Sequence, residues 1–214
     1  MTGTIGPHEL SQMFQSAAAR IRERHAVLSA LDSASGDGDH GTTMLRIVDQ
    51  LDVARSSSEL KTILHDGGWK ILTVDGGASS SLLGIFFLGM AEAPECNGPL
   101  DCPALAATFE AGLAAVSKQT RARPGDKTMM DALVPAIESL RAAVHAGKSV
   151  VEAMQDAAGA ARAGAESTSG LTARFGRAKF LGEKTRGHQD PGAASIALLF
   201  EGFSMALAES KETQ

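Results

Sequence analysis

The amino-acid sequence predicts an all-α fold, in which eight helices joined mostly by short links run antiparallel to their neighbours. Aromatic residues make up only 4% of the chain, tyrosine is absent, and alanine and glycine are abundant. Strands are usually rich in β-branched and aromatic residues, so this composition favours helices that approach one another closely. No alternating apolar pattern supports a βαβ unit, which leaves a helical architecture.

The first two predicted helices flank an acidic, glycine-rich segment. Residues 8–31 place apolar side chains mostly at three- and four-residue steps, the spacing of one apolar helix face. The sequence Ser-Gly-Asp-Gly-Asp at 35–39 interrupts this pattern, and residues 42–54 resume it. The second helix is therefore expected to begin beside the acidic segment.

The next three predicted helices are separated by glycine- and proline-containing breaks. Residues 58–72 begin with serines and with Glu59 in the first turn, which is typical of a helix start. Gly76 and Gly77 interrupt the pattern, and a fourth helix is predicted at 79–93. The prolines and the Asn-Gly pair at 93–103 predict an irregular loop, followed by a fifth helix from about 104 to 118.

Three helices and one long connection complete the predicted chain. Residues 127–145 have helical spacing with Pro135 inside, where a kink is expected. Residues 150–167 form an alanine-rich seventh helix, and residues 193–208 form the eighth. Loops longer than about 12–15 residues in compact domains are usually functional or disordered. The charged, glycine-containing connection at 168–192 is therefore interpreted as a ligand lid.

Length, charge and composition predict one domain over residues 1–214 and exclude several classes of protein. The net charge of −5 gives no basis for a nucleic-acid surface. No signal peptide is recognised, and no apolar stretch is judged long enough for a membrane span, so a cytoplasmic protein without a membrane partner is expected. Cys96 and Cys102 fit neither a zinc pattern nor a disulfide framework and are interpreted as free thiols.

Three carboxylates between the first two helices predict a metal site. Asp32, Asp37 and Asp39 carry the hard oxygen ligands that Mg²⁺ and Ca²⁺ prefer, and such a cluster repels itself without a cation. An EF-hand is excluded because Val48 would stand where that loop needs a bidentate glutamate. An Asp/Gly turn capping the second helix is the plainer alternative. Mg²⁺ is favoured if a phosphate completes the coordination shell, and a Ca²⁺-binding helical protein remains an alternative.

Two glycine-containing helix starts predict an anion site near these carboxylates. Gly41, Thr42 and Thr43 open the second helix, where free N–H groups and the helix dipole favour an anion. The sequence Gly-Gly-Ala-Ser-Ser-Ser at 76–81 has the same chemistry at the fourth helix. Each is by itself an ordinary helix cap, but both together with the carboxylates indicate a nucleotide phosphate site.

Two other catalytic motifs are excluded. Residues 142–149 end in the Gly-Lys-Ser of a P-loop, but Ala142 replaces the first glycine and no strand precedes it. Residues 77–81 resemble a nucleophile elbow but end in serine, again without a preceding strand.

Basic residues in two of the later loops could neutralise phosphates or could simply be solvated surface charges. They lie in the turn 121–128 and in the connection 168–192, where they are Arg174, Arg177, Lys179, Lys184 and Arg186. The sequence Gly-His-Gln-Asp-Pro-Gly at 187–192 is more specific, because it repeats the glycine, histidine and aspartate combination of the first site.

Five separated blocks resemble the nucleotide-binding subunit of dihydroxyacetone kinases, known as DhaL. They are Leu-Asp-x4-Asp-Gly-Asp-His-Gly at 31–41, Gly-Gly-Ala-Ser at 76–79, Pro-Gly-Asp-Lys-Thr-Met at 124–129, Gly-Arg-Ala at 176–178, and Leu-Gly-Glu at 181–183 with Gly-His-Gln-Asp-Pro-Gly-Ala at 187–193. The blocks occur in the family's order and span nearly the whole chain.

The resemblance implies an eight-helix antiparallel up-and-down barrel with ADP or ATP bound at one end through two Mg²⁺ ions. It places the metal ligands at Asp32, Asp37 and Asp39, and the adenine contact at Met129. It implies phosphate contacts from His40, Gly41, Thr42, Thr43, Ala78, Ser79 and Ser80, and a lid formed by Arg177, Asp190, Pro191 and Gly192. The chain departs from the family at Thr43, where asparagine is common, and at Ser80 and Thr120, where glycine is common.

The resemblance also implies a partner. In this family a separate, DhaK-like subunit or domain holds the sugar covalently through a histidine that has no match here, so this chain alone is not expected to phosphorylate a triose. No catalytic side chain is assigned to this chain, because positioning and charge neutralisation suffice. The residues leave open an ATP-dependent pair, a phosphotransferase-system donor that rephosphorylates bound ADP, a nucleotide-binding regulator without turnover, and a homodimer.

Overall fold

A computed structural model of the chain describes residues 3–54 and 57–212. Within these residues the structure has eight α-helices and three short 3₁₀ helices, and its only β-type pairing is an isolated bridge between Ile5 and Leu100. The α-helices are α1 (Pro7–Ser33), α2 (His40–Ala54), α3 (Leu60–Leu72), α4 (Gly77–Ala91), α5 (Cys102–Gln119), α6 (Met130–His145), α7 (Val150–Ser167) and α8 (Pro191–Glu212). The 3₁₀ helices are η1 (Pro94–Asn97), η2 (Thr168–Gly170) and η3 (Arg177–Thr185).

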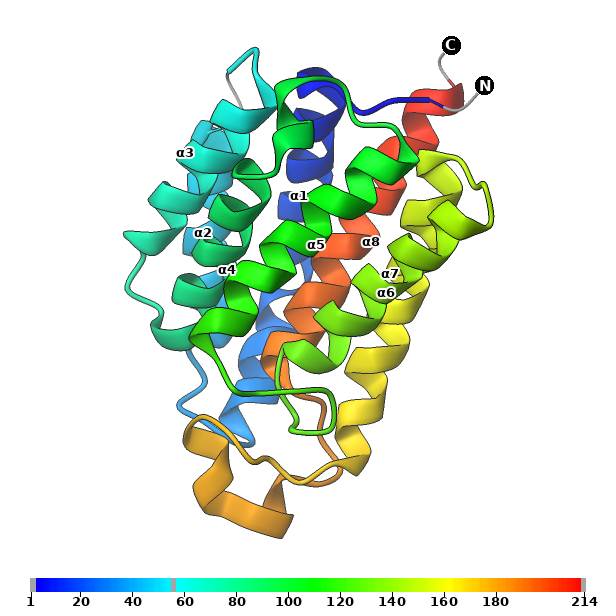
Figure 1. Cartoon of the computed structure of the whole chain (residues 1–214). Coiled ribbons are helices and arrows are strands. Elements are labelled where there is room, and N and C mark those ends of the chain that lie inside the picture. Colours follow the sequence, from blue (N-terminus) through cyan, green and yellow to red (C-terminus); the bar gives the residue numbers. More distant parts are fainter. Residues whose placement is uncertain (1–2, 55–56, 213–214) are drawn as a thin grey trace.

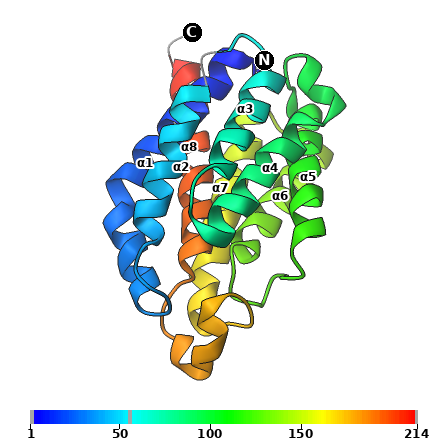
Figure 2. The ribbon, with the colours of Figure 1, turned by 90° about the vertical axis from the view of Figure 1, so that its left-hand side faces the viewer.

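The helices form a closed antiparallel ring. Each α-helix packs against the next one along the chain, and α1 packs against α8, which closes the ring (Figure 1). The second view shows α1, α2 and α8 side by side at one edge of the ring (Figure 2). The predicted all-α, up-and-down architecture is therefore confirmed.

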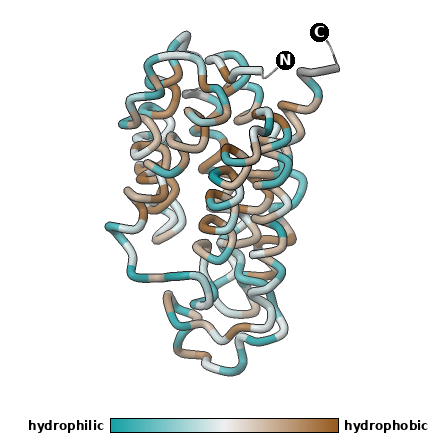
Figure 3. The backbone as a smooth tube through the Cα atoms, turned by 45° about the vertical axis from the view of Figure 1, so that its right-hand side comes forward, coloured by the Kyte–Doolittle hydropathy of each residue, from teal (hydrophilic) through white to brown (hydrophobic). Residues whose placement is uncertain are grey.

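The centre of the barrel is built from aromatic rings. Six phenylalanines from α1, α4, α5 and α8 contact one another with ring centroids 5.2–6.3 Å apart: Phe14, Phe86, Phe87, Phe109, Phe200 and Phe203. All six are buried. Hydrophobic residues occur along all the helices, whereas the connection below them is mostly hydrophilic or neutral (Figure 3).

Small residues let neighbouring helices approach closely, as the composition predicted. A Cβ added to Gly202 of α8 would lie 2.3 Å from the Cα of Ala17 in α1. A Cβ added to Gly89 of α4 would lie 2.5 Å from the Cβ of Ala115 in α5. Larger side chains at these glycines would push the ring apart.

Pro135 lies inside α6 without ending it. Proline has no N–H to donate to the carbonyl four residues earlier, which here belongs to Asp131. Gly164 of α7 packs against that carbonyl, since a Cβ added to Gly164 would lie 2.1 Å from the Asp131 oxygen. The helix starts at Met130 rather than at the predicted residue 127, because residues 125–128 form a turn in which Lys127 has a φ of 60°.

Two expectations about the last third of the chain need correction. The connection predicted as a long loop at 168–192 contains η2 and η3, and α8 begins at Pro191 rather than at residue 193. The stretch Pro191–Glu209 of α8 is long and apolar enough to span a membrane by length and composition, so the expectation that no stretch approaches this length was wrong. Half of that stretch is buried within the protein, since α8 packs against α1 and α7.

The two ends of the barrel differ in structure. The connections that contain η2 and η3 lie at one end, and the first and last described residues lie at the opposite end (Figure 1). The acidic segment between α1 and α2 lies at the same end as η3, because Arg177 of η3 forms an ion pair with Asp37.

Candidate functional site

A cavity of about 450 Å³ opens at the η3 end of the barrel. Its walls come from the first turns of α2, α4 and α8, from the segment between α5 and α6, and from the start of η3. These segments are far apart in the sequence, and the ring of helices brings them together.

The acidic segment folds into a tight turn around Asp32. The N–H of Gly36 donates to the Asp32 carbonyl over 2.5 Å, and a Cβ on Gly36 would lie 2.3 Å from Oδ1 of Asp32. Gly38 has a φ of 79°, a conformation that favours glycine. The turn brings carboxylate oxygens of Asp32, Asp37 and Asp39 within 4.8 Å of one another.

The three carboxylates do not share one electrostatic environment. Loss of solvent contact, and then the charge of Asp37, raise the pKa of Asp39. The hydrogen bond from Arg177 is the main cause of the lowered pKa of Asp37. An all-oxygen cluster with this mutual repulsion fits a hard divalent cation, so the residues present fit the predicted metal.

His40 connects the first turns of three helices. It begins α2, and its backbone N–H lies 3.3 Å from Oδ2 of Asp32. Its ring places Nδ1 3.3 Å from Oγ of Ser79 in α4 and Nε2 2.7 Å from Oγ of Ser195 in α8. Because Ser195 also bonds to the carbonyl of Pro191, all these contacts are satisfied when Nε2 of His40 carries the ring proton. Burial lowers the pKa of His40, which keeps the imidazole neutral at pH 7.

Three helix starts therefore converge on the cavity. A Cβ on Gly76, the residue before α4, would lie 2.4 Å from Cγ2 of Thr43, which shows how closely α4 approaches α2. At α8, the N–H of Ala193 donates to Oδ2 of Asp190 over 2.8 Å. Asp190 thus already caps the start of α8. The starts of α2 and α4 are the ones that present free N–H groups and the positive end of the helix dipole, which favour an anion there.

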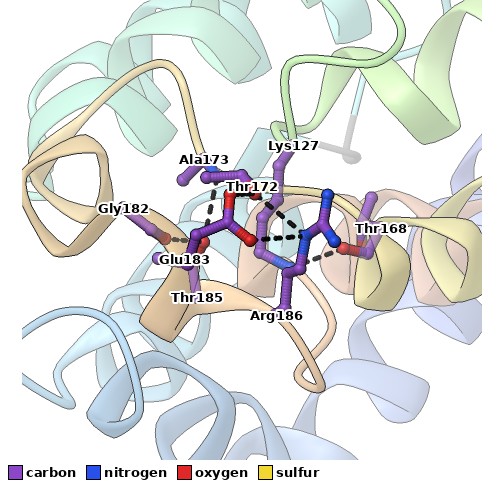
Figure 4. Close-up of polar contacts among 8 residues, drawn as sticks. All are labelled: Lys127, Thr168, Thr172, Ala173, Gly182, Glu183, Thr185 and Arg186. Carbon is purple, nitrogen blue, oxygen red and sulfur yellow. Dashed lines mark hydrogen bonds and ion pairs between the residues drawn. The ribbon is translucent and has the colours of Figure 1, made fainter.

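A buried lysine holds together the two ends of the η3 connection, around Thr168 and His188, which form its neck. Lys127 is only 4% exposed, and its Nζ donates to the carbonyls of Thr168 and His188. These two carbonyls lie at the two ends of the connection (Figure 4 draws the bond to Thr168). Burial lowers the pKa of Lys127, whereas the charges of Asp190 and Asp131 act in the opposite direction.

Backbone and side-chain bonds complete this neck. The N–H of Gly187 donates to the Ser169 carbonyl over 2.8 Å, and the N–H of Asp190 donates to Oγ1 of Thr168 over 2.8 Å. Burial raises the pKa of Asp190 to about 7. The connection thus leaves and re-enters the barrel at a fixed position beside the cavity.

Part of the cavity wall is apolar. Its side chains come from α4, α6, α8 and the segments beside them: Leu82, Leu83, Ala122, Met129, Met130, Phe175 and Ile196. A cavity that combines acidic groups, helix starts and apolar side chains suits a ligand with a charged and a flat apolar part.

Most of the residues predicted from the sequence meet in this cavity. Those that line it are Asp32, Asp39, His40, Thr43, Ala78, Ser79, Met129, Arg177, Asp190, Pro191 and Gly192. Asp37 lies at its edge through its ion pair with Arg177.

Three predicted phosphate positions lie outside the cavity wall. Gly41 packs on α1, since a Cβ there would lie 2.0 Å from the carbonyl oxygen of His25. Thr42 is exposed, and Ser80 is buried with its Oγ 3.3 Å from the Gly77 carbonyl. Their assignments stay predictions.

Sequence reasoning missed four residues that shape the site. Lys127 lies in the turn 121–128, whose basic residues could have neutralised phosphates or solvated a surface, and it belongs to one of the five blocks, but no role in holding the later connection was predicted for it. Asp131 holds that turn, accepting from the N–H groups of Gly125 and Thr128 over 2.6 and 2.7 Å. Ser195 and Thr168 carried no signal in the sequence, because only the packing of distant helices brings them to the cavity.

Known proteins are similar to this chain over most of its length. The DAK2 domain family matches residues 34–205. A relative from Escherichia coli (strain K12), named "PEP-dependent dihydroxyacetone kinase, ADP-binding subunit DhaL", is 39% identical over 186 residues, covering 85% of this chain and 88% of its own. The "Triokinase/FMN cyclase" of Rattus norvegicus is 35% identical over 81% of this chain but only 30% of its own length.

Solved structures show the same arrangement. The dihydroxyacetone kinase of C. freundii in complex with AMP-PNP and Mg²⁺ is 29% identical with a TM-score of 0.73, over 98% of this chain and 35% of that chain. Its native form has a TM-score of 0.71 at 30% identity, over 94% of this chain and 34% of that chain. The chain therefore spans about a third of that kinase.

Proposed function

This chain belongs to the DAK2 domain family, and on that premise we propose that it is the nucleotide-binding subunit of a dihydroxyacetone-type kinase. It would transfer a phosphoryl group to a short ketose held by a partner subunit. The observation that carries the proposal is the cluster of Asp32, Asp37 and Asp39 beside three helix starts that share one cavity. Carboxylates for a metal and N–H groups for phosphates are the two needs of a Mg-nucleotide site.

The three aspartates would hold the cation, and two Mg²⁺ ions are proposed. When bound, Mg²⁺ supplies neutralisation of the charge on the phosphates. The starts of α2 and α4, with His40, Thr43, Ala78 and Ser79, would hold the phosphates in position. Arg177, at the start of η3, brings a guanidinium to the same side of the cavity as Asp37.

The apolar wall would receive the adenine ring of ADP or ATP. Met129 is 8% exposed and lines the cavity with Met130 and Leu83. Asp190, Pro191 and Gly192 form the adjoining rim at the start of α8. With the ring bound beside Met129 and the start of α8, the phosphates would be held at the starts of α2 and α4.

The acceptor sugar and the phosphoryl donor are proposed to come from other proteins. The family resemblance assigns the sugar to a DhaK-like subunit. Two of the similar relatives, from E. coli and Listeria innocua, are named as PEP-dependent kinase subunits that bind ADP, which favours a phosphotransferase-system donor over free exchange of ATP. We also propose that residues 1–214 act as one domain and that the protein is cytoplasmic.

Calorimetric titration with Mg²⁺ and ADP tests the proposal. The wild-type chain is expected to bind ADP only when Mg²⁺ is present, and Asp37→Asn is expected to weaken binding by at least about 10-fold, since even changes behind the coordinating ligands commonly cost about 10–100-fold. Asp66→Asn is the matched control, because Asp66 is an exposed aspartate on α3 whose recorded partner is His65.

Two results would contradict the proposal at different points. Unchanged ADP affinity of D37N at limiting Mg²⁺ would remove the metal assignment. Two outcomes with the wild-type chain would remove the kinase function. One is that it binds no Mg-nucleotide. The other is that, with candidate sugar-binding subunits present and with either ATP or a phosphorylated donor protein supplied, it transfers no phosphate to any of several short ketoses. Tighter binding of Ca²⁺ than of Mg-ADP would favour the calcium alternative.

A further inference from the structure

The tip of the η3 connection displays an apolar pair to solvent. Phe180 is 82% exposed, and the adjacent Leu181 is 40% exposed. Neither side chain lines the cavity. The ring of Phe180 is more exposed than the other large apolar side chains that the structure describes as exposed, Val27, Trp69, Leu181 and Met205. Its burial on a partner would be favourable by the hydrophobic effect.

The tip is held in shape by the bonds beneath it (Figure 4). The N–H of Ala173 donates to Oγ1 of Thr185 over 3.0 Å, and that hydroxyl donates to the Gly182 carbonyl over 2.8 Å. Oγ1 of Thr172 lies 2.9 Å from Oε1 of Glu183. These bonds join residues 172–173, before η3, to residues 182–185 at its end. Phe180, which lies between them, is therefore presented by a preformed framework.

A further bond strengthens the same framework. Nε of Arg186 donates to Oγ1 of Thr172 over 3.1 Å and lies 3.1 Å from a carboxylate oxygen of Glu183. A preformed binding segment loses less conformational entropy on association than a flexible one.

The surroundings of the tip are basic although the whole chain is acidic. Residues 171–186 contain five Lys and Arg against one Glu, whereas the chain carries a net charge of −5. Arg174, Arg177 and Arg186 each pair with a carboxylate of this chain. Lys179 instead lies with Nζ 4.8 Å from the centroid of the Phe180 ring. The apolar pair is thus bordered by positive charge.

The position of the tip selects its partner. Arg177, three residues before Phe180, pairs with Asp37 at the edge of the cavity. Transfer requires the acceptor hydroxyl to come within reacting distance of the terminal phosphate. A protein that presents the acceptor to this cavity must therefore approach the end of the barrel at which the η3 connection lies.

We propose that Phe180 and Leu181 are the docking tip for the sugar-holding subunit, which would receive them in an apolar pocket with an acidic rim. This inference rests on the proposed function. A central aromatic anchor surrounded by polar contacts is the usual arrangement of a binding hot spot. The basic residues would raise the association rate, and the apolar pair would slow dissociation.

The experiment separates docking from nucleotide binding. Wild type, Phe180→Ala and Trp69→Ala are titrated with Mg-ADP. They are then supplied with a phosphoryl donor, either Mg-ATP or the phosphorylated donor protein, and assayed for phosphoryl transfer at increasing concentrations of a sugar-binding subunit that supports transfer by wild type. Trp69 is a matched control, since it is an exposed aromatic residue on α3, 55% exposed. F180A is expected to raise the KM for the sugar-binding subunit by about 10-fold or more, the range of a hot-spot truncation. Its ADP affinity and its rate at saturating partner should stay within about twofold, and W69A should match wild type.

Charge reversal tests the acidic rim. The double variant Lys179→Glu and Lys184→Glu is expected to raise the same KM and to reduce its dependence on salt, because rim charges act mainly through long-range attraction. An unchanged KM for F180A, or an equal loss of ADP affinity, would overturn the docking proposal. Failure of wild type to transfer with every partner tested would instead overturn the proposed function on which it rests.

Discussion

The ring of His40 touches two hydroxyl groups that come from helices far from it in the sequence. Ser79 belongs to α4 and Ser195 to α8, yet their hydroxyls lie 3.3 and 2.7 Å from the two ring nitrogens. A neutral imidazole can satisfy both serines, whereas a protonated one would offer two donors and lose an acceptor. The lowered pKa of His40 therefore keeps the three helix starts in one arrangement at neutral pH.

Asp190 gives a pH-dependent stability that can be measured directly. Burial raises its pKa from 3.8 to about 7, so between these pH values the folded state holds a proton that the unfolded state has lost. Stability from this group is therefore lost as the pH rises through about 7. Asp190→Asn keeps an acceptor for the Ala193 N–H but cannot ionise. Wild type should therefore lose Tm relative to D190N as the pH rises from about 5 to about 8. Differential scanning calorimetry of both proteins measures this difference.

Asp190→Ala is the control for the cap itself. It removes the acceptor for the Ala193 N–H, so its Tm should be lower than that of D190N at every pH, by the equivalent of about 0.5–2 kcal/mol. Parallel Tm curves for wild type and D190N would show that Asp190 does not titrate in this range.

At the scale of elements, the regular helices were predictable and the connection that contains η3 was not. Helical apolar spacing continues through α2, α7 and α8, so their existence follows from one periodic signal. The η3 connection has no such signal, because hydrogen bonds such as that between Ala173 and Thr185 hold its shape. The start of α6 was missed for the same reason, since Asp131 accepts the N–H groups of a turn that looks helical by composition.

Lys127 determines where this connection is attached. Lys127→Met keeps a side chain of similar length but removes the donor for the Thr168 and His188 carbonyls. The Thr168 carbonyl keeps the N–H of Leu171 as a donor, so the loss falls mainly on the His188 carbonyl. An unpaired buried polar group costs about 1–3 kcal/mol, so the neck should open more often. Limited trypsin digestion should cut within residues 171–186 about 10-fold faster or more in this variant, because a lower free energy of local opening raises the population of the opened, cleavable state.

Lys148→Met is the matched control for the loss of a lysine. Lys148 is paired with Asp156 on the surface, far along the chain from the η3 connection. Equal trypsin sensitivity of both variants and wild type would mean that Lys127 does not hold the neck.

For the whole molecule, closure of the ring is what creates the site. Neighbouring helices along the chain could be inferred from short links, but the contact between α1 and α8 joins the two ends of the sequence. That contact positions Asp32, at the end of α1, near Asp190, just before α8, so that both line one cavity. The individual motifs were visible in the sequence, whereas their distances depend on the closed barrel.

The aromatic centre should control stability without controlling nucleotide binding. Phe109 contacts Phe86, Phe200 and Phe203 with ring centroids 5.6–6.3 Å apart, and it does not line the cavity. Phe109→Ala should lower the free energy of unfolding by about 3–5 kcal/mol, measured by urea denaturation. Phe180→Ala, which removes an exposed ring, should change it by less than about 0.5 kcal/mol.

Nucleotide affinity provides a second measurement for Phe109→Ala. At a temperature where F109A is fully folded, its affinity for Mg-ADP should stay close to that of wild type. A large loss of affinity in the folded variant would show that the centre of the barrel transmits strain to the cavity.

The two described chain ends, at the far end of the barrel from the cavity, set the geometry of any covalent tether. The 22 residues of α8 correspond to about 33 Å of helix. A small group attached at either end through a flexible linker needs a linker of at least about this length to reach the cavity of the same chain. A shorter linker would favour pairing with the cavity of another molecule. For the free chain, immobilisation through either end in a biosensor leaves the mouth of the cavity and the η3 tip facing the solution.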